Sequence, residues 1–352
     1  MAIRITGTGS YIPSIIEKNE DFYNHKFLNA DGSAINSTNE IIVEKFKAIT
    51  GIQERRYVKE DLLNSDIAFF ASLKAIEDAK IDKESIDYII VAHNYGDVKH
   101  NAEQSDTVPS IASRVKHLLK IKNQKCVGYD LLFGCPGWIE GVIQAKAFIA
   151  SGIAKRCLVI GTETLSRVVD KHDRDSMIYS DGAGAVIVEE SHEEGGILAH
   201  ETATHTLDEA HFIYFGETNN SEITDKRRYI KMYGRKIYEF ALTNVPTALK
   251  SCLEKSGKSI TDVKKILIHQ ANEKMDEAIV ERFYKLYDMK MPEGIMPMTI
   301  NTLGNSSVAT VPTLLDLILK GQLENQEINK GDIIMFASVG AGMNINAIVY
   351  QY

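Results

Sequence analysis

Two parts of the chain repeat the same order of strands and helices, and this repeat restricts the possible folds more than any other feature. Each part has a continuous apolar strand, a helix that begins at a glycine and a polar or thiol residue, and a second apolar strand that ends in glycine. Residues 89–91 correspond to residues 266–268, and Gly134-Cys135 corresponds to Gly304-Asn305. The chain therefore reads as two related halves.

Alternating strands and helices predict parallel sheets with helices on their faces. Uninterrupted apolar runs are typical of strands that are buried on both faces. We expect an N-terminal half over residues 1–205 and a C-terminal half over residues 206–352, divided in a polar, irregular segment. Two such halves would bring equivalent strand ends to a shared seam, where α/β proteins place their sites.

Composition narrows the class of protein. The 352 residues suffice for two domains, and 44% hydrophobic with 25% charged residues is ordinary for a globular protein. The net charge of -8 argues against a general binder of nucleic acid or anionic membranes. The four cysteines lack metal-ligand spacing, so we expect no metal and a reducing, cytoplasmic location. We find neither a signal-peptide core nor an apolar run of ~20 residues, the length that a membrane span needs.

Cys135 is the leading candidate for a nucleophile. It lies between Gly134 and Pro136, just before a predicted helix. Aligned dipoles and free amides at a helix N-terminus lower the pKa of a thiol, and proline suits the first helical turn. A buried structural cysteine is the alternative, and the residue pattern alone leaves both open. The other cysteines lie in apolar patterns and are expected to be structural: Cys126, Cys157 and Cys252.

Two polar residues stand where the repeat predicts a site. His269 ends a buried strand, and Asn305 occupies the position equivalent to Cys135. Asn305 and Cys135 should therefore face each other, although a locally bonded histidine and a helix N-cap are the ordinary alternatives. One backbone amide of Gly340-Ala341-Gly342, with that of Cys135, would form an oxyanion hole. Residues 181–184 lack phosphate-loop spacing and read as a structural glycine turn.

Taken together, these motifs resemble β-ketoacyl-ACP synthase III-type enzymes of the thiolase-like superfamily over nearly the whole chain. The motifs are Thr50-Gly51-Ile52-Gln53-Glu54-Arg55-Arg56, the elbow Phe133-Gly134-Cys135-Pro136-Gly137-Trp138, Asp181-Gly182-Ala183-Gly184-Ala185, His269-Gln270-Ala271-Asn272, Gly304-Asn305-Ser306-Ser307 and Gly340-Ala341-Gly342. The resemblance implies a five-layer αβαβα sandwich, a homodimer, a Cys135–His269–Asn305 triad, and CoA or phosphopantetheine thioesters as substrates without a resident cofactor.

The family chemistry is decarboxylative condensation. The resemblance implies that Cys135 takes an acyl group from a CoA or carrier-protein thioester. His269 and Asn305 would hold the thioester carbonyl of a malonyl-type donor, and the amides of Cys135 and Ala341 would hold the oxyanion. The expected substrate-channel residues are Met232, Gly234, Leu165, Met177 and Ile178. The expected cations for a carrier protein or CoA are Arg174, Arg235, Lys274 and Arg282.

The sequence also departs from this family. Pro136 follows the cysteine, where a small residue is usual. The adenine-clamping tryptophan expected upstream of Thr50 is absent, since Trp138 is the only tryptophan, and this favours a carrier-bound acyl donor. The elbow, together with a polar excursion at residues 17–40, resembles ketosynthases of specialised pathways, including dialkylresorcinol or flexirubin-type lipids. The alternatives are an acyl-cysteine transferase or hydrolase that forms no carbon–carbon bond, and a partner subunit of a ketosynthase heterodimer.

Overall fold

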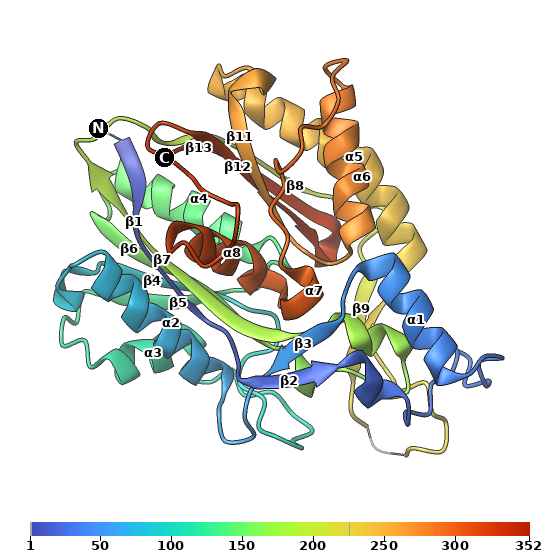
Figure 1. Ribbon diagram of the computed structural model, residues 1–352. Helices are drawn as coiled ribbons and strands as arrows, with labels where there is room; N and C mark the ends of the chain where they lie inside the picture. Colours follow the sequence, from blue (N-terminus) through green and yellow to red (C-terminus); the bar gives the residue numbers. More distant parts are fainter. Residues whose placement is uncertain (1, 225) are drawn as a thin grey trace.

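The computed structural model describes residues 2–224 and 226–352, and its helices and sheets form five layers (Figure 1). Two helices lie between the two sheets, and two more lie on the outer side of each sheet. The central helices are α4 (Gly137–Ala150) and α8 (Thr310–Leu319). The outer helices are α2 (Asn64–Asp78) and α3 (Ile111–Leu119) on the first sheet, and α5 (Gly234–Ser256) and α6 (Glu273–Lys285) on the second. The predicted αβαβα order is confirmed.

The strand order of the two sheets contains the repeat. The first sheet has the order β1-β7-β6-β4-β5 and the second β11-β12-β13-β8. When the orders are aligned, β4 corresponds to β11, β6 to β12, β7 to β13 and β1 to β8. The strands of the first sheet are β1 (Ala2–Tyr11), β4 (Tyr88–Ala92), β5 (Val127–Leu131), β6 (Arg156–Thr164) and β7 (Asp181–Ser191). Those of the second are β8 (Gly196–Thr204), β11 (Val263–Ile268), β12 (Ile333–Gly340) and β13 (Asn344–Gln351).

Both sheets are mixed, so the prediction of parallel sheets is wrong for part of each. β4 is parallel to β5 and β6, and β11 is parallel to β12. β7 is antiparallel to β1 and β6, and β13 is antiparallel to β8 and β12. The segment of residues 341–343 between β12 and β13 is too short for a crossover helix, so β13 has to return antiparallel. Residues 181–184, predicted as a turn, lie within β7.

The chain changes sheets earlier than the predicted boundary at residue 205. β7 ends at Ser191 in the first sheet, and β8 begins at Gly196 in the second. The segment that follows is less irregular than predicted, because β9 (Ile213–Gly216) and β10 (Tyr229–Met232) pair as a small antiparallel sheet. This sheet lies beside the seam and contributes walls to the cavity described below.

Gly137 and Trp138, which follow Pro136, allow α4 to pack between the two sheets. Trp138 is fully buried and packs edge-on against Phe336, with ring centroids 5.7 Å apart. A Cβ built on Gly137 would lie 3.0 Å from Cβ of Ala92, so a larger residue would push the helix off β4. The unusual elbow therefore serves packing between the halves.

The Thr50–Arg56 motif anchors the polar excursion. α1 (Asn39–Thr50) follows the excursion, β2 (Ile15–Lys18) pairs with β3 (Glu54–Tyr57), and the short helix α7 (Ile300–Leu303) lies beside β3. Arg55 is fully buried and donates two hydrogen bonds to the Met177 carbonyl, at 3.0 and 2.7 Å. Its guanidinium also lies 4.9 Å from the centre of the Phe22 ring. Arg55 thus fixes the excursion to the body of the molecule.

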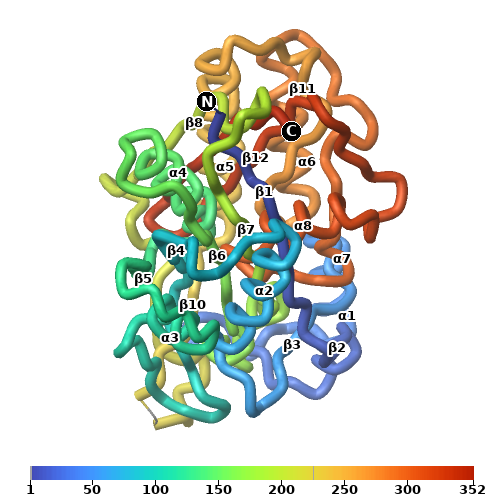
Figure 2. Tube along the Cα trace, turned by 90° about the vertical axis from the view of Figure 1, so that its left-hand side faces the viewer, coloured from blue at the N-terminus to red at the C-terminus, as the bar shows by residue number. Residues whose placement is uncertain are grey.

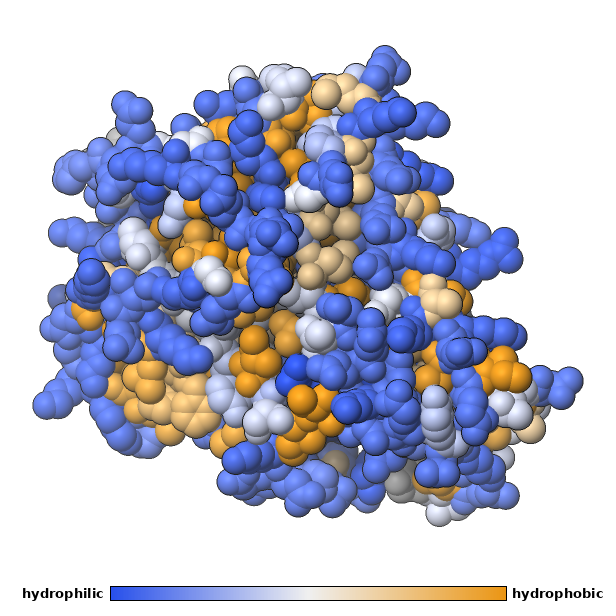
Figure 3. Space-filling view, in the orientation of Figure 1, coloured by the Kyte–Doolittle hydropathy of each residue, from blue (hydrophilic) through white to orange (hydrophobic). Residues whose placement is uncertain are grey.

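The two ends of the chain lie at the same end of the molecule, near the start of β1 and the end of β13 (Figures 1 and 2). The face in Figure 3 is mainly hydrophilic, with hydrophobic residues in small separate patches. Within residues 2–224 and 226–352, no helix is both long enough and apolar enough to cross a membrane.

Candidate active site

A cavity of about 620 Å³ lies where the carboxyl ends of β6, β11 and β12 meet, and it opens between α1 and the start of α5. Its walls carry far more apolar than polar surface. Cys135, His269 and Asn305 all line it, although they come from three distant parts of the sequence. The structure therefore brings the predicted triad together at the seam of the two halves.

Backbone geometry presents the thiol of Cys135 to this cavity. Gly134 adopts a left-handed conformation with φ 66°, and its carbonyl accepts a hydrogen bond of 3.0 Å from the Gly137 amide. This tight turn ends directly before α4. A Cβ built on Gly134 would lie 2.7 Å from the amide nitrogen of Ala341, so only glycine allows the two turns to approach.

The pKa of the thiol differs from the sequence-based prediction. Burial raises the pKa of Cys135 to about 11, and this outweighs a hydrogen bond from the Ser307 hydroxyl, which lies 3.3 Å from Sγ and acts in the opposite direction. The predicted lowering at the helix N-terminus is therefore wrong. A thiol with a pKa this high is neutral near pH 7.

His269 follows β11 and is almost fully buried. Its Nδ1 lies 2.8 Å from Oγ1 of Thr310, which in turn donates a 3.0 Å hydrogen bond to the Ser307 carbonyl. Because that hydroxyl proton is used, Nδ1 carries the imidazole proton and Nε2 keeps a lone pair, a tautomer assigned from the hydrogen bonds. Burial lowers the pKa of His269 to about 4, so the imidazole is neutral near pH 7.

Asn305 is held by its backbone and by its side-chain oxygen. Its amide donates to the Ile178 carbonyl at 3.0 Å, and its carbonyl accepts from the Ser180 amide at 2.8 Å. The side-chain Oδ1 accepts a 2.7 Å hydrogen bond from the Ser307 amide. Because Oδ1 is engaged, Nδ2 is the group that the side chain offers to a ligand, and it is a hydrogen-bond donor.

The amides of Cys135 and Ala341 lie next to each other. A Cβ built on Gly340 would lie 2.5 Å from the amide nitrogen of Cys135. Asn344, which the sequence analysis missed, joins the two turns, since its Nδ2 donates to the Phe133 carbonyl at 3.2 Å and to the Ala341 carbonyl at 2.8 Å. The role of these two amides as oxyanion donors stays a prediction.

Comparisons with known proteins identify this arrangement. Residues 129–206 match the family model of 3-oxoacyl-[acyl-carrier-protein] synthase III, and residues 253–352 match its C-terminal model. A β-ketoacyl-[acyl-carrier-protein] synthase III of Staphylococcus saprophyticus is 32% identical over 353 residues, covering 100% of this chain and 99% of that protein. The chain belongs to the 3-oxoacyl-ACP synthase III family. It is therefore an acyltransferase of the ketosynthase type.

Solved structures of this family have the same fold. The crystal structure of 3-oxoacyl-[acyl-carrier-protein] synthase III from Aquifex aeolicus superposes with a TM-score of 0.81, at 29% identity and with 100% of both chains covered. The enzyme from Thermus thermophilus gives a TM-score of 0.81, at 28% identity and with 99% of both chains covered. The predicted thiolase-like architecture is confirmed.

This synthase has a buried acid beside its triad that the sequence analysis also missed. Glu163 lies near the end of β6, is 1% exposed and accepts a short hydrogen bond from Nδ2 of Asn94. The same Nδ2 lies 3.2 Å from the Ser307 hydroxyl oxygen. Burial raises the pKa of Glu163 to about 8. A charged residue shortly after the apolar run at residues 157–160 of β6 was the available sequence signal.

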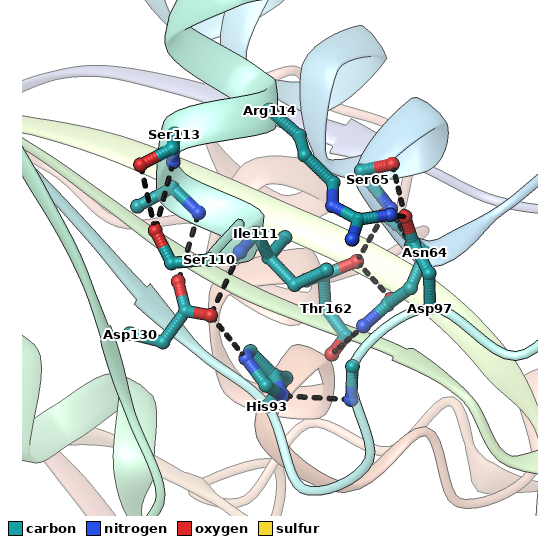
Figure 4. Close-up of polar contacts among 12 residues, drawn as sticks. Asn64, Ser65, His93, Asp97, Ser110, Ile111, Ser113, Arg114, Asp130 and Thr162 are labelled. Atoms are coloured by element: carbon teal, nitrogen blue, oxygen red, sulfur yellow. Dashed lines mark hydrogen bonds and ion pairs between the residues drawn. The ribbon is translucent and has the colours of Figure 1, made fainter. Parts of the chain in front are cut away.

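Hydrogen bonds on both sides hold the loop that carries Asn94 and Tyr95 (Figure 4). His93 donates through Nε2 to Asp130 at 2.9 Å, and Asp130 also accepts the first amides of α3. Asp97 accepts from the Ser65 amide and hydroxyl, and from Arg114 at 2.8 Å. The loop that carries Asn94 and Tyr95, both of which line the cavity, is thus hydrogen-bonded to residues of α2, α3 and β5.

The expected channel residues divide into two groups. Met232, Gly234, Leu165 and Ile178 line the cavity. Met177 does not: its side chain is fully buried in a cluster with Phe22, Phe27, Ile42 and Val43. The expectation for Met177 is corrected, because the 3₁₀ turn at Arg174–Ile178 points it toward the excursion.

The expected cations divide similarly. Arg174 and Arg235 are exposed and line the mouth of the cavity, together with Lys45, which the sequence analysis missed. Lys274 and Arg282 are exposed but lie outside the lining, and Arg282 donates to the Leu242 carbonyl at 3.1 Å. Only the first group is placed to meet a ligand in the cavity.

Proposed function

We propose that this synthase loads Cys135 from a carrier-bound acyl thioester and condenses that acyl group with a malonyl-type thioester on a carrier protein. The convergence of Cys135, His269 and Asn305 on one cavity, beside two adjacent backbone amides, supports the proposal. It gives a nucleophile, a proton acceptor, a carbonyl donor and an oxyanion hole within one apolar space.

Loading is a transthioesterification. The thiol of Cys135 attacks the acyl carbonyl, its proton passes to Nε2 of His269, and the amides of Cys135 and Ala341 hold the oxyanion. Collapse breaks the bond to the pantetheine sulfur, which leaves with the proton from His269. The acyl group is then held as a thioester on Sγ, and His269 is neutral again.

Condensation needs a donor for the carbonyl of the incoming malonyl-type thioester. Nδ2 of Asn305 supplies one hydrogen bond. When the Thr310 hydroxyl turns from the Ser307 carbonyl to Nδ1, the imidazole proton of His269 is carried on Nε2 instead of Nδ1. Nε2 then donates the second hydrogen bond to the thioester carbonyl. The carbon–carboxylate bond breaks, CO₂ leaves, and the enolate carbon attacks the acyl carbonyl on Cys135. The thiolate leaves, and the product is a β-ketoacyl thioester.

The residues at the mouth of the cavity suit a carrier-bound acyl donor better than acyl-CoA. The segment where the family's clamping tryptophan is expected carries Lys45, Phe46 and Ile49, and all three line the cavity. Lys45, Arg174 and Arg235 can attract the phosphate of a pantetheine arm and an acidic carrier protein. A role in a dialkylresorcinol or flexirubin-type pathway stays a prediction.

A homodimer joined at β5 and a cytoplasmic location complete the proposal. β5 is an edge of the first sheet, and Val127 and Leu132 beside that edge are 45% and 66% exposed. An unpaired edge with apolar side chains favours pairing with a second strand. The four unpaired cysteines suit a reducing compartment.

Intact-mass spectrometry tests the proposed acyl donor. The enzyme is incubated with equal amounts of one acyl group on a carrier protein or on CoA, and adduct formation is followed with time. We expect faster loading from the carrier, and no adduct in Cys135→Ala. Loading from neither donor, over short and long acyl chains, would refute acyl transfer, and faster loading from CoA would refute the donor preference.

A further inference from the structure

The site leaves one chemical requirement unexplained. Loading needs a thiolate on Cys135, yet burial raises the pKa of this thiol to about 11. His269 cannot provide a resting positive charge, because burial also lowers its pKa, to about 4. The cations that line the cavity lie at its exposed mouth. A hydrogen-bond donor beside Sγ would stabilise the negative charge that develops on the sulfur as its proton leaves.

Ser307 contacts this sulfur. Its hydroxyl lies 3.3 Å from Sγ of Cys135. The residue is 3% exposed, lines the cavity and has the positive φ of 51°, an uncommon conformation for a residue other than glycine. Such a conformation persists only where surrounding contacts hold it.

Asn94 sets the direction of the Ser307 hydroxyl. Nδ2 of Asn94 donates to Oγ of Ser307 at 3.2 Å, and its second proton goes to Glu163. Because Oγ accepts from Asn94, the hydroxyl proton of Ser307 is left to point at the sulfur. Hydrogen bonds of His93 and Asp97 anchor the two ends of the loop that carries Asn94 (Figure 4).

The backbone of Ser307 holds the other two members of the triad. Its amide donates to Oδ1 of Asn305 at 2.7 Å. Its carbonyl accepts from Thr310 at 3.0 Å, and Thr310 contacts Nδ1 of His269 at 2.8 Å. One residue thus connects the nucleophile, the carbonyl donor and the imidazole, so movement of Ser307 would disturb all three together.

We propose that Ser307 is a further catalytic residue, whose hydroxyl donates a hydrogen bond to the Cys135 thiolate while Asn94 and Glu163 act as positioning residues that aim it. The hydroxyl keeps its own proton throughout. The Ser307 hydroxyl contributes because it already points at Sγ when the proton of Cys135 leaves. The inference rests on Cys135 being the nucleophile of the proposed function.

Alkylation of Cys135 by iodoacetamide tests this role without any acyl donor. The rate is measured across pH by intact mass for the wild type, Ser307→Ala and Ser307→Gly. A hydrogen bond to a charged group contributes enough that its loss should slow alkylation about tenfold to a hundredfold below the thiol pKa. The pH–rate profile should move to higher pH by about one to two units, and this displacement is read below the midpoint, because the pKa of the thiol is already about 11. Asn94→Ala should move the profile in the same direction, by less.

Ser306→Ala is the matched control, because Ser306 is the buried neighbouring serine and its side chain faces Gly182. This variant should leave the pH–rate profile unchanged. Ser307→Gly also relieves the positive φ, so a shift shared by both Ser307 variants reports the hydroxyl and not backbone strain. An unchanged pH–rate profile in both variants, or an equal displacement in Ser306→Ala, overturns the proposal. Because no acyl group is involved, this outcome is independent of whether the enzyme condenses thioesters.

Discussion

Oγ1 of Thr310 lies 2.8 Å from Nδ1 of His269, so the direction of this hydrogen bond depends on which imidazole nitrogen carries the proton. With the hydroxyl donated to the Ser307 carbonyl, Nε2 is a base. With the hydroxyl turned to Nδ1, Nε2 is a donor. In the proposed mechanism, loading uses the first tautomer and decarboxylation the second, so one rotating hydroxyl would serve both half-reactions.

Thr310→Val should separate these half-reactions. Without the hydroxyl, Nδ1 keeps its proton and Nε2 stays a base, so loading of Cys135 should remain within about threefold of the wild type. Loss of one donor to the enolate oxygen should slow CO₂ release about a hundredfold. Intact mass follows loading, and labelled CO₂ follows decarboxylation. Thr310→Ser should restore both rates, and equal slowing of both steps in Thr310→Val would contradict the account.

Glu163 should make the reactivity of the thiol depend on pH. Burial raises its pKa to about 8, so it is neutral below that pH and negatively charged above it. The charge opposes thiolate formation, so the alkylation rate of the wild type should rise less steeply above about pH 8 than that of Glu163→Gln. Gln keeps the acceptor for Asn94. Superimposable profiles of the two proteins would contradict this prediction.

The carboxyl group of Glu163 should also make the free energy of unfolding depend on pH. Its folded-state pKa is raised above the ordinary carboxyl value of 4.5, so its stabilising contribution is complete below that value and is lost as the pH rises through about 8. Between about pH 5 and about pH 9 the free energy of unfolding should fall more in the wild type than in Glu163→Gln. Urea unfolding at several pH values measures the difference, and parallel curves would count against it.

Asn344 should matter for the oxyanion hole. Asn344→Ala removes both hydrogen bonds that join the turns carrying Cys135 and Ala341. When the amides of Cys135 and Ala341 are held less firmly, acyl loading of Cys135 should slow by about tenfold to a hundredfold. Thr204→Val is the control, since it removes only the 2.6 Å bond that Thr204 donates to Oδ1 of Asn344. Normal loading by Asn344→Ala in a single-turnover assay would exclude this role.

Trp138 should contribute mainly to stability. Trp138→Ala leaves a cavity between α4 and Phe336 and should lower the free energy of unfolding by about 3–5 kcal/mol. Trp138→Phe keeps an aromatic ring and should cost less. Denaturant unfolding gives both values. A loss below about 1 kcal/mol in Trp138→Ala would contradict its placement as the packing centre between the halves.

Apolar runs and helix starts encode the repeat, so the sequence predicted two α/β halves and placed Asn305 opposite Cys135. The five-layer order and the triad with His269 came from the resemblance to the family. The sequence did not predict the antiparallel strands β7 and β13, since an apolar run carries no direction. Glu163, Asn94 and Asn344 were missed because their partners are distant in sequence. Met177 was misplaced because neighbouring residues in a 3₁₀ turn face different sides, and the thiol pKa was misjudged because burial is a property of the assembled halves.

Condensation on preloaded enzyme tests the central claim most directly. Acyl-Cys135 enzyme is purified, mixed with a malonyl-loaded carrier protein for one turnover, and the carrier is analysed by mass spectrometry. We predict a β-ketoacyl carrier lengthened by the acyl group, release of one CO₂ per product, and return of Cys135 to the free thiol. Loss of the acyl group as a free acid, with the carrier unchanged or merely decarboxylated, would contradict the account.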